Sequence, residues 1–241
     1  MATPAPASDE CVIVEAERVD QISSRLRAAN VSVPGRASGR HKEQVEVYSL
    51  VRVLGSRPYA LTDFPLKLIK RERPDFLLTL DGTQIGIEHT EAITRNAAKE
   101  AFLRDGGAGP AVHFVRPPSL TEPAKSSQEL RAEIAADKGG PGWVGDSVES
   151  GWVAAMKFFV MKKFQLLQKE GYPRFERTWL VIYDNWTAPI LNLMTALPLL
   201  RASLDSLATW SLFDRVFILD ENELIEIDSS TIHVYCVNHC R

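Results

Sequence analysis

The sequence predicts an α/β fold in which one mixed sheet is flanked by helices. In the second half of the chain, short apolar runs alternate with segments of helical periodicity, a pattern typical of strands joined by helices. An Asp-Gly pair at 81–82 separates two further apolar runs, and this pair is a strong signal for a tight β-hairpin. Helical connections and hairpins together predict a sheet with parallel and antiparallel strands.

The individual elements follow from the same patterns. Helices are expected where apolar residues recur with helical spacing, at 14–28, 41–54, 126–138, 151–170 and about 188–209. Strands are expected at the short apolar runs 75–80, 84–91, 178–184, 216–219, 223–228 and 231–237. Residues 59–71 are expected to be irregular or briefly helical, and 92–104 to be a helix or a frayed extension.

The chain is expected to form a single domain over residues 36–241, preceded by an N-terminal extension at 1–35. The first ten residues are rich in Ala, Pro and Ser and are expected to be disordered. A Gly- and Pro-rich segment at about 105–150 is long for a loop in a compact domain, which predicts an insertion or a mobile lid.

Composition limits the classes of function. The chain has 241 residues, 45% of them hydrophobic, which is enough for a sizeable core. A formal net charge of -3 argues against non-specific coating of nucleic acid, although a local basic patch remains compatible with it. The three cysteines define no disulfide framework, no signal peptide is recognisable, and no apolar run approaches the ~18 residues of a membrane span. A cytoplasmic protein is therefore expected.

Two acids on either side of the predicted hairpin are the leading candidates for a chemical centre. Asp75 opens the first strand and Glu88 lies in the second, among apolar neighbours where an unpaired carboxylate would be costly. Pairing about the Asp-Gly turn would bring the two carboxylates close together. Because like charges repel at short range, a bound divalent cation is a common reason for retaining both.

Two helices are expected to direct charged residues at the same sheet. At about 100° per residue, Glu43 falls in the middle of the apolar arc of helix 41–54, whereas Glu46 lies towards its edge. Lys163 lies near the centre of the apolar arc of helix 151–170. Simpler roles remain open, since Glu43 could interact with the dipole of its helix and Lys163 could extend its ammonium to solvent.

These residues carry a family resemblance. Pro74-Asp75, followed after about 12 residues by the stretch 87–91 (IEHTE), resembles the signature of the PD-(D/E)XK nuclease superfamily. The upstream helix with Glu43 matches that superfamily's first helix, and the order of later segments is similar to small bacterial members. The resemblance covers roughly residues 40–235 and depends on few residues.

The resemblance implies a three-layer, restriction-endonuclease-like core that holds Mg²⁺ or Mn²⁺. By position, Asp75, Glu88 and Glu43 would bind the metal through their carboxylates, and His89 through its backbone carbonyl. The metal would lower the pKa of a bound water and stabilise charge on the scissile phosphate. The implied activity is hydrolysis of phosphodiester bonds in DNA, with RNA as the alternative substrate. Many members of the superfamily are dimers, so a homodimer is a further expectation.

One departure from the signature concerns the catalytic lysine. Its place, two residues after Glu88, is taken by Thr90, whose hydroxyl can hold a water but carries no positive charge. One hypothesis is that the lysine has migrated, with Lys163 as the first candidate and Lys99 as the second. The other is that the site is inactive and the fold binds nucleic acid or a protein partner.

Basic residues cluster immediately before Pro74. They are Lys67, Lys70, Arg71 and Arg73. Such a cluster could lead a phosphate backbone into the site, or it could be an ordinary solvated surface.

Two other patterns suggest different chemistry. Gly145-Asp146-Ser147 resembles the nucleophile block of GDSL-type esterases, but no late Asp-x-x-His follows it. Cys236, His239 and Cys240 could bind Zn²⁺, but three ligands crowded at the chain end, without a second pair, make a weak site.

Overall fold

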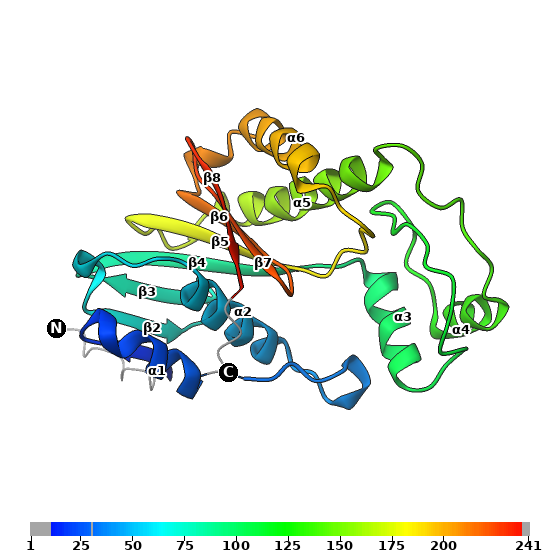
Figure 1. Cartoon of the computed structure of the whole chain (residues 1–241), viewed down its shortest axis with the longest axis horizontal. Coiled ribbons are helices and arrows are strands. Elements are labelled where there is room, and N and C mark those ends of the chain that lie inside the picture. The colour runs from blue at the N-terminus through cyan, green and yellow to red at the C-terminus, as the bar shows by residue number, and fades with distance from the viewer. Residues whose placement is uncertain (1–10, 30, 238–241) are drawn as a thin grey trace.

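A computed structural model describes residues 11–29 and 31–237 of the chain. Its centre is an eight-stranded sheet in which the spatial order of the strands equals their order along the chain (Figure 1). The strands are β1 (Cys11–Ala16), β2 (Leu66–Lys70), β3 (Phe76–Leu80), β4 (Thr83–Ala92), β5 (Arg177–Asp184), β6 (Arg215–Leu219), β7 (Glu223–Ile227) and β8 (Ile232–Cys236).

The sheet is mixed, as predicted. Strands β1 to β4 are antiparallel, β4, β5 and β6 are parallel, and β6 to β8 are antiparallel again. Parallel neighbours need a crossover connection, which here contains helices in each case. The helices are α1 (Val19–Ala29), α2 (Lys42–Ser56), α3 (Arg95–Asp105), α4 (Ser127–Ala136), α5 (Ser147–Leu167) and α6 (Leu193–Ser206).

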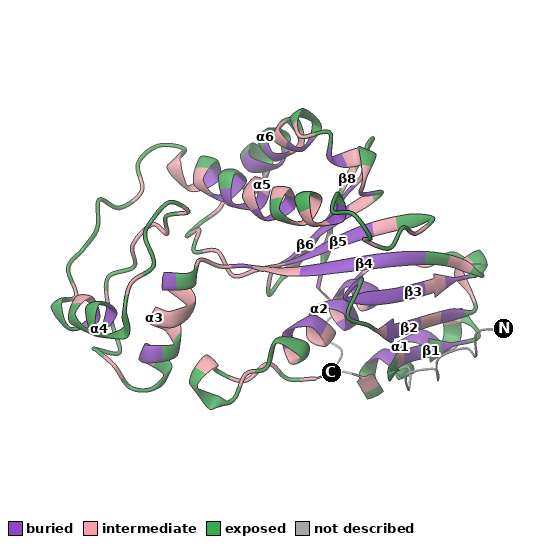
Figure 2. Cartoon of the chain, turned by 180° about the vertical axis from the view of Figure 1, so that it is seen from behind, coloured by how far each residue is buried: buried purple, intermediate pink, exposed green. Residues whose placement is uncertain are grey.

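Helices cover both faces of the sheet. In β5, Trp179 and Val181 join a buried cluster that includes residues of α1 and α2, whereas Leu180 and Ile182 join a second cluster with α5 and α6. This alternation follows from the period of two in a strand. Figure 2 shows the buried residues concentrated in the sheet and on the helix faces that pack against it. The predicted α/β sheet flanked by helices is therefore confirmed.

The N-terminal region differs from the prediction. Residues expected to begin a helix at 14 instead form β1, and residues 66–70, expected to be irregular or helical, form β2. The two strands pair with each other, and Val14 and Ala16 are buried in the core. Residues 11–29 therefore belong to the same sheet and core as the rest of the domain, so the predicted boundary at residue 35 does not separate an extension from it. Residues 1–10 lie outside the described part.

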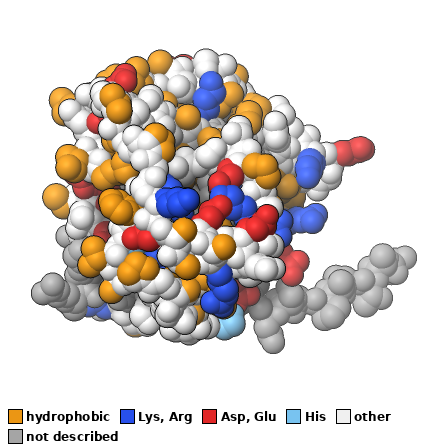
Figure 3. All heavy atoms as spheres, turned by 90° about the vertical axis from the view of Figure 1, so that its right-hand side faces the viewer, with side chains coloured by type: hydrophobic (Ala, Val, Ile, Leu, Met, Phe, Trp, Pro, Cys, Tyr) orange, Lys and Arg blue, Asp and Glu red, His pale blue; other side chains and the backbone are white. Residues whose placement is uncertain are grey.

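The predicted insertion lies to one side of the sheet. The segment between α3 and α5 carries α4 and packs against α3 through a small cluster of Leu103, Leu130 and Ile134 (Figure 1). The face on this side shows hydrophobic side chains interspersed with Lys, Arg, Asp and Glu (Figure 3). Within the described ranges, no helix has the length and apolar character that crossing a membrane requires.

Candidate functional site

The β3–β4 hairpin brings Asp75 and Glu88 together. Its register pairs Leu80 with Thr83 at the turn and Phe76 with Ile87 at the other end, which makes Asp75 and Glu88 next in line. The turn residues Asp81 and Gly82 have φ angles of 46° and 80°, the left-handed pair that a type I′ turn requires. The predicted hairpin about this turn is confirmed.

A lysine from a distant helix joins the two carboxylates. The Lys163 ammonium, on α5, lies 3.0 Å from Asp75 Oδ2 and 2.5 Å from Glu88 Oε2. Residues two apart on β4 share a face, so Glu88 points away from the α1–α2 core that holds Ile85 and Ile87 and towards α5. The structure thus puts the Lys163 ammonium beside the acid pair, on the face that the helical wheel indicated.

The other candidate lysine lies elsewhere. The Lys99 ammonium, on α3, donates a hydrogen bond of 3.1 Å to the carbonyl of Lys125, in the segment that leads into α4. Thr90, in the signature position for lysine, lines a pocket together with Lys163 and His89.

The remaining oxygen of Glu88 is bonded from a loop. The Tyr172 hydroxyl, just after α5, donates to Glu88 Oε1. The same loop packs on β4, where a Cβ added at Gly86 would lie 2.6 Å from Cδ2 of Phe175. Gly86 therefore allows the loop to approach closely enough for Tyr172 to reach Glu88. No local sequence pattern marked Tyr172, because its role depends on a contact between distant segments.

The surroundings of the two acids shift their pKa values in opposite directions. Burial favours the neutral form of Asp75, but the Lys163 ammonium and the backbone N–H of His89, 2.8 Å from Oδ2, outweigh it and lower the pKa of Asp75. Burial raises the pKa of Glu88, and the nearby Asp75 charge adds to this, against the opposing effect of Lys163. A pair of acids separated in this way is a common feature of sites that bind or transfer protons.

Helix α2 contributes Glu46 to this centre and leaves Glu43 exposed. Glu46 is 1% exposed and pairs with the ammonium groups of Lys42 at 2.8 Å and Lys70 at 2.9 Å. Glu43 is exposed and lines the open pocket beside the site. The expectation that Glu43 packs on the sheet was wrong because a helical wheel gives direction only, and the first turn of α2 faces this pocket.

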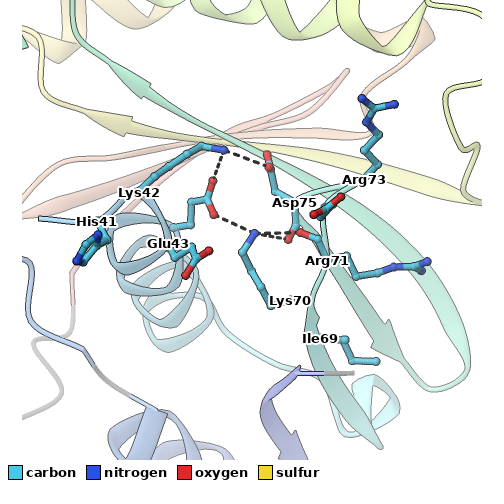
Figure 4. A pocket seen from close by; sticks show the side chains of 10 residues that line it. His41, Lys42, Glu43, Ile69, Lys70, Arg71, Arg73 and Asp75 are labelled. Carbon is cyan, nitrogen blue, oxygen red and sulfur yellow. Dashed lines mark hydrogen bonds and ion pairs between the residues drawn. The ribbon is translucent and has the colours of Figure 1, made fainter. Parts of the chain in front are cut away.

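Lysine side chains neutralise the negative charges of the acids in this centre. Lys42 Nζ also lies 3.8 Å from Asp75 Oδ1, and Lys70 Nζ donates to the Asp75 carbonyl at 2.9 Å (Figure 4). Together with Lys163, three lysines therefore accompany the carboxylates of Glu46, Asp75 and Glu88.

His89 points to the opposite face of the sheet. Its Nε2 lies 3.1 Å from the Ser49 hydroxyl on α2, and that hydroxyl donates to the Val45 carbonyl. Burial lowers the pKa of His89 to about 3, which keeps the imidazole neutral at physiological pH. The side chain of His89 therefore contributes to packing, while its backbone N–H orients Asp75.

A pocket of about 1160 Å³ opens beside Asp75. Lys70, Arg71 and Arg73 of the predicted basic cluster line it, whereas Lys67 lies between Glu15 and Thr79 on paired strands. The lining also includes acidic residues, namely Glu43, Glu46, Glu72 and Asp75, against the basic Lys42, Lys70, Arg71 and Arg73. The surface is therefore rich in both signs of charge.

The donor set limits the kind of metal that the site could hold. Within residues 11–29 and 31–237, no three His, Cys, Asp or Glu side chains converge closely enough to form a metal site. Asp75 and Glu88 offer two carboxylates. This set suits Mg²⁺, which is usually bound by one or two carboxylates with waters and substrate phosphates, better than it suits an all-protein Zn²⁺ or Ca²⁺ site.

The two other patterns gain no support. The Ser147 hydroxyl accepts a hydrogen bond of 2.8 Å from the Val144 N–H at the start of α5, a typical helix-terminus interaction. Cys236 is an exposed free thiol, and its suggested co-ligands His239 and Cys240 lie outside the described residues. The chain matches no family model, no curated protein and no solved structure.

Proposed function

We propose that the protein is a Mg²⁺-dependent nuclease with a restriction-endonuclease-like core. The observation that carries the proposal is the contact of the Lys163 ammonium with both Asp75 and Glu88. It supplies, from a different element, the positive charge that Thr90 lacks. A lysine beside two acids at the end of a hairpin is the arrangement that the superfamily resemblance implies, although an eight-stranded sheet is larger than that core requires.

The residues present fit a divalent cation. Asp75 lines the open pocket, and its Oδ1 lies 3.8 Å from the Lys42 ammonium, so a cation in the pocket would lie beside this carboxylate. Glu88 would be the second carboxylate ligand. A bound Mg²⁺ would acidify a water and offset charge on the phosphate. Lys163 would neutralise developing negative charge, and Tyr172 would fix the orientation of Glu88.

A second candidate function is non-catalytic binding of nucleic acid. It is favoured by the balance of Glu46, Asp75 and Glu88 against Lys42, Lys70 and Lys163, since a site already neutral needs no further cation. Arg71 and Arg73 would then contact phosphates.

A cleavage assay separates the two functions. Single-stranded, duplex and branched DNA, together with RNA, are incubated with wild-type protein and Mg²⁺ or Mn²⁺. Cleavage that disappears in Asp75→Asn and Glu88→Gln but persists in Glu43→Gln would establish the enzyme. Binding of the same substrates without cleavage by any variant would leave the binding function.

Metal binding has its own measurement. Mg²⁺ or Mn²⁺ should raise the melting temperature of the wild type, because a ligand of the folded state stabilises it by mass action. Asp75→Ala and Glu88→Ala should lose this rise, while Glu43→Gln should retain it. If the alanine variants keep the full rise, the ion does not bind at this pair.

A further inference from the structure

A second pocket adjoins the first one and includes the lysine that contacts the acid pair. Its volume is about 500 Å³, and Lys42 lines it as well as the first pocket. Lys163, which contacts both acids, also lines it. A ligand in this pocket would therefore lie directly beside the candidate catalytic residues.

One wall of the pocket is basic and held firmly in position. Arg36 and Arg40 line it, and each uses one terminal nitrogen to bond Glu91 Oε1 at the end of β4, with a distance of 2.8 Å for Arg40. Asn185 also donates to this oxygen, at 2.5 Å. One carboxylate thus faces two guanidiniums, each of which has five N–H donors, so donors and positive charge remain for an anion.

The loop that carries these arginines is fixed from a second side. The backbone N–H of Arg36 donates to the Asp105 carboxylate at 2.6 Å, at the end of α3. The short helix η1 (Arg36–Ser38) lies beside α3 as a result (Figure 1). A site held in place before binding loses less conformational entropy when the ligand arrives.

The part of the lining that comes from α3 is apolar. Phe102 and Ala98, one helical turn apart, both line the pocket, and Phe102 remains 50% exposed. An exposed aromatic ring and two arginines in the lining of one pocket match the two parts of a nucleotide, since bases stack on aromatic rings and phosphates bind guanidinium groups.

We infer that this pocket binds one unpaired nucleotide of a single-stranded nucleic acid, with its base on Phe102 and its phosphate on Arg36 and Arg40. Stacking on a side chain requires a base that has left the stack of a duplex, so the pocket selects single strands or frayed ends. The inference rests on the proposed function in placing the adjacent phosphate at Asp75 and Glu88, but binding in the pocket needs no catalysis.

The test measures affinity without cleavage. Fluorescent oligothymidine and oligouridine of about ten nucleotides, and a matched duplex, are titrated in EDTA and followed by anisotropy. Phe102→Ala should weaken single-strand binding about 5- to 150-fold, the usual range for loss of one base stack, and leave duplex binding unchanged. Arg40→Gln should weaken it and reduce its salt dependence.

Matched controls lie away from the pocket. Phe114, 63% exposed, and Arg131, exposed on α4, allow Phe114→Ala and Arg131→Gln to be made, and both should bind like the wild type. Melting temperatures confirm that each variant is folded. The inference is overturned if wild-type protein binds neither oligomer, or if Phe102→Ala and Arg40→Gln both bind them normally.

The outcomes also separate this inference from the nuclease proposal. Cleavage that depends on Glu88 but not on Phe102 would retain the enzyme and remove the subsite. Phe102-dependent binding in a protein that cleaves nothing would retain the subsite and remove the enzyme.

Discussion

Carboxylates at two places on the same sheet are stabilised by different kinds of partner. Asp75 and Glu88 share the ammonium of Lys163 beside an open pocket. Asp184, at the end of β5, instead accepts hydrogen bonds from two neutral donors. These are the indole N–H of Trp152 at 2.6 Å and the backbone N–H of Trp186 at 3.0 Å. Burial raises the pKa of Asp184 to about 6, while those two donors oppose the shift.

The difference separates a candidate functional centre from a structural one. The end of a parallel strand is a frequent place for ligands in α/β sheets, so position alone would favour Asp184. The partners indicate the opposite assignment, because flexible lysines can yield to a substrate or cation, whereas the Trp152 indole is fixed in the core at 1% exposure. The chemistry of the partners, more than location in the fold, identifies the centre.

Removal of the shared ammonium should give the largest effect. Lys163→Met leaves the charges of Asp75 and Glu88 without their common partner, and the loss of one member of a buried pair costs about 3 kcal/mol of unfolding free energy. The Lys163 ammonium would stabilise negative charge that develops during cleavage, so its loss should also reduce any cleavage rate about 10²- to 10³-fold. Urea denaturation and a cleavage assay measure the two effects. The exposed neighbour provides a control, Lys162→Met, and equal losses in both variants would contradict the assignment.

Asp184 should show a pH dependence of its own. Its folded pKa of about 6 exceeds the ordinary 3.8, so the folded state binds the proton more tightly and the stabilisation from this residue is lost as pH rises through about 6. Asp184→Asn cannot ionise, so its stability relative to the wild type should rise by about 2–3 kcal/mol between pH 4 and pH 7. Urea unfolding at both pH values measures this.

A control of opposite sign exists in the same chain. Asp228 has a pKa lowered to about 2, where burial opposes the shift and hydrogen bonds from Ser230 and Thr231 produce it. The stabilisation that the ionised Asp228 carboxylate provides is lost as pH falls from about 4 to about 2. Asp228→Asn cannot ionise, so its stability relative to the wild type should fall as pH rises through this same interval. The same trend in both variants would contradict the contrast between the two environments.

The loop that holds Glu88 can be tested through Gly86. Gly86→Ala forces the Phe175 ring to move, and overpacking of this kind typically costs about 1–3 kcal/mol. Because Tyr172 is in the same loop, the bond to Glu88 should weaken and any activity should fall with stability. Gly151 is the matched control, since a methyl group there meets open space within α5 and should stabilise the helix by about 0.5–1 kcal/mol. If Gly86→Ala left stability and activity unchanged, the position of the loop would not depend on the close contact between Gly86 and Phe175.

The parts of the fold and site that the sequence predicted correctly are those determined by local patterns, namely a hairpin turn and a helix periodicity. The Asp81-Gly82 turn determines the hairpin register within a few residues, so the proximity of Asp75 and Glu88 followed from sequence. The apolar arc of α5 indicated the direction of Lys163 in the same way. Strand β1 was missed because it is short and its partner β2 lies 50 to 59 positions away in the chain, so this pairing is a tertiary contact. Strand β2 also pairs with the adjacent β3, but residues 71–75 between them contain no Asp-Gly or Asn-Gly hairpin signal.

The missed site residues depend on tertiary contacts as well. Tyr172 reaches Glu88 only because a loop packs on Gly86, and Glu46 is buried because Lys42 and Lys70 meet it from two elements. The contacts from Tyr172 and Lys70 leave no periodic signal, whereas the Lys42–Glu46 pair has the i, i+4 spacing of a helix. Sequence reasoning therefore found Asp75, Glu88 and Lys163 from the hairpin turn and the helical wheel, and missed Tyr172 and Glu46, each of which has a partner in a distant segment.

The smallest effect is expected at Glu43, where the helical wheel and the structure disagree. Glu43→Gln changes an exposed side chain and should alter stability by less than about 0.5 kcal/mol, with metal response and cleavage unchanged. Glu46→Gln removes a buried charge that pairs with two lysines, and should cost about 1.5–3 kcal/mol, the usual range for hydrogen bonds to charged groups. Thermal shift with and without Mg²⁺ compares the two variants directly. If Glu43→Gln abolished the metal response and Glu46→Gln did not, Glu43 would be the acid of α2 that contributes to metal binding. The ion pairs of Glu46 with Lys42 and Lys70 would then serve stability alone.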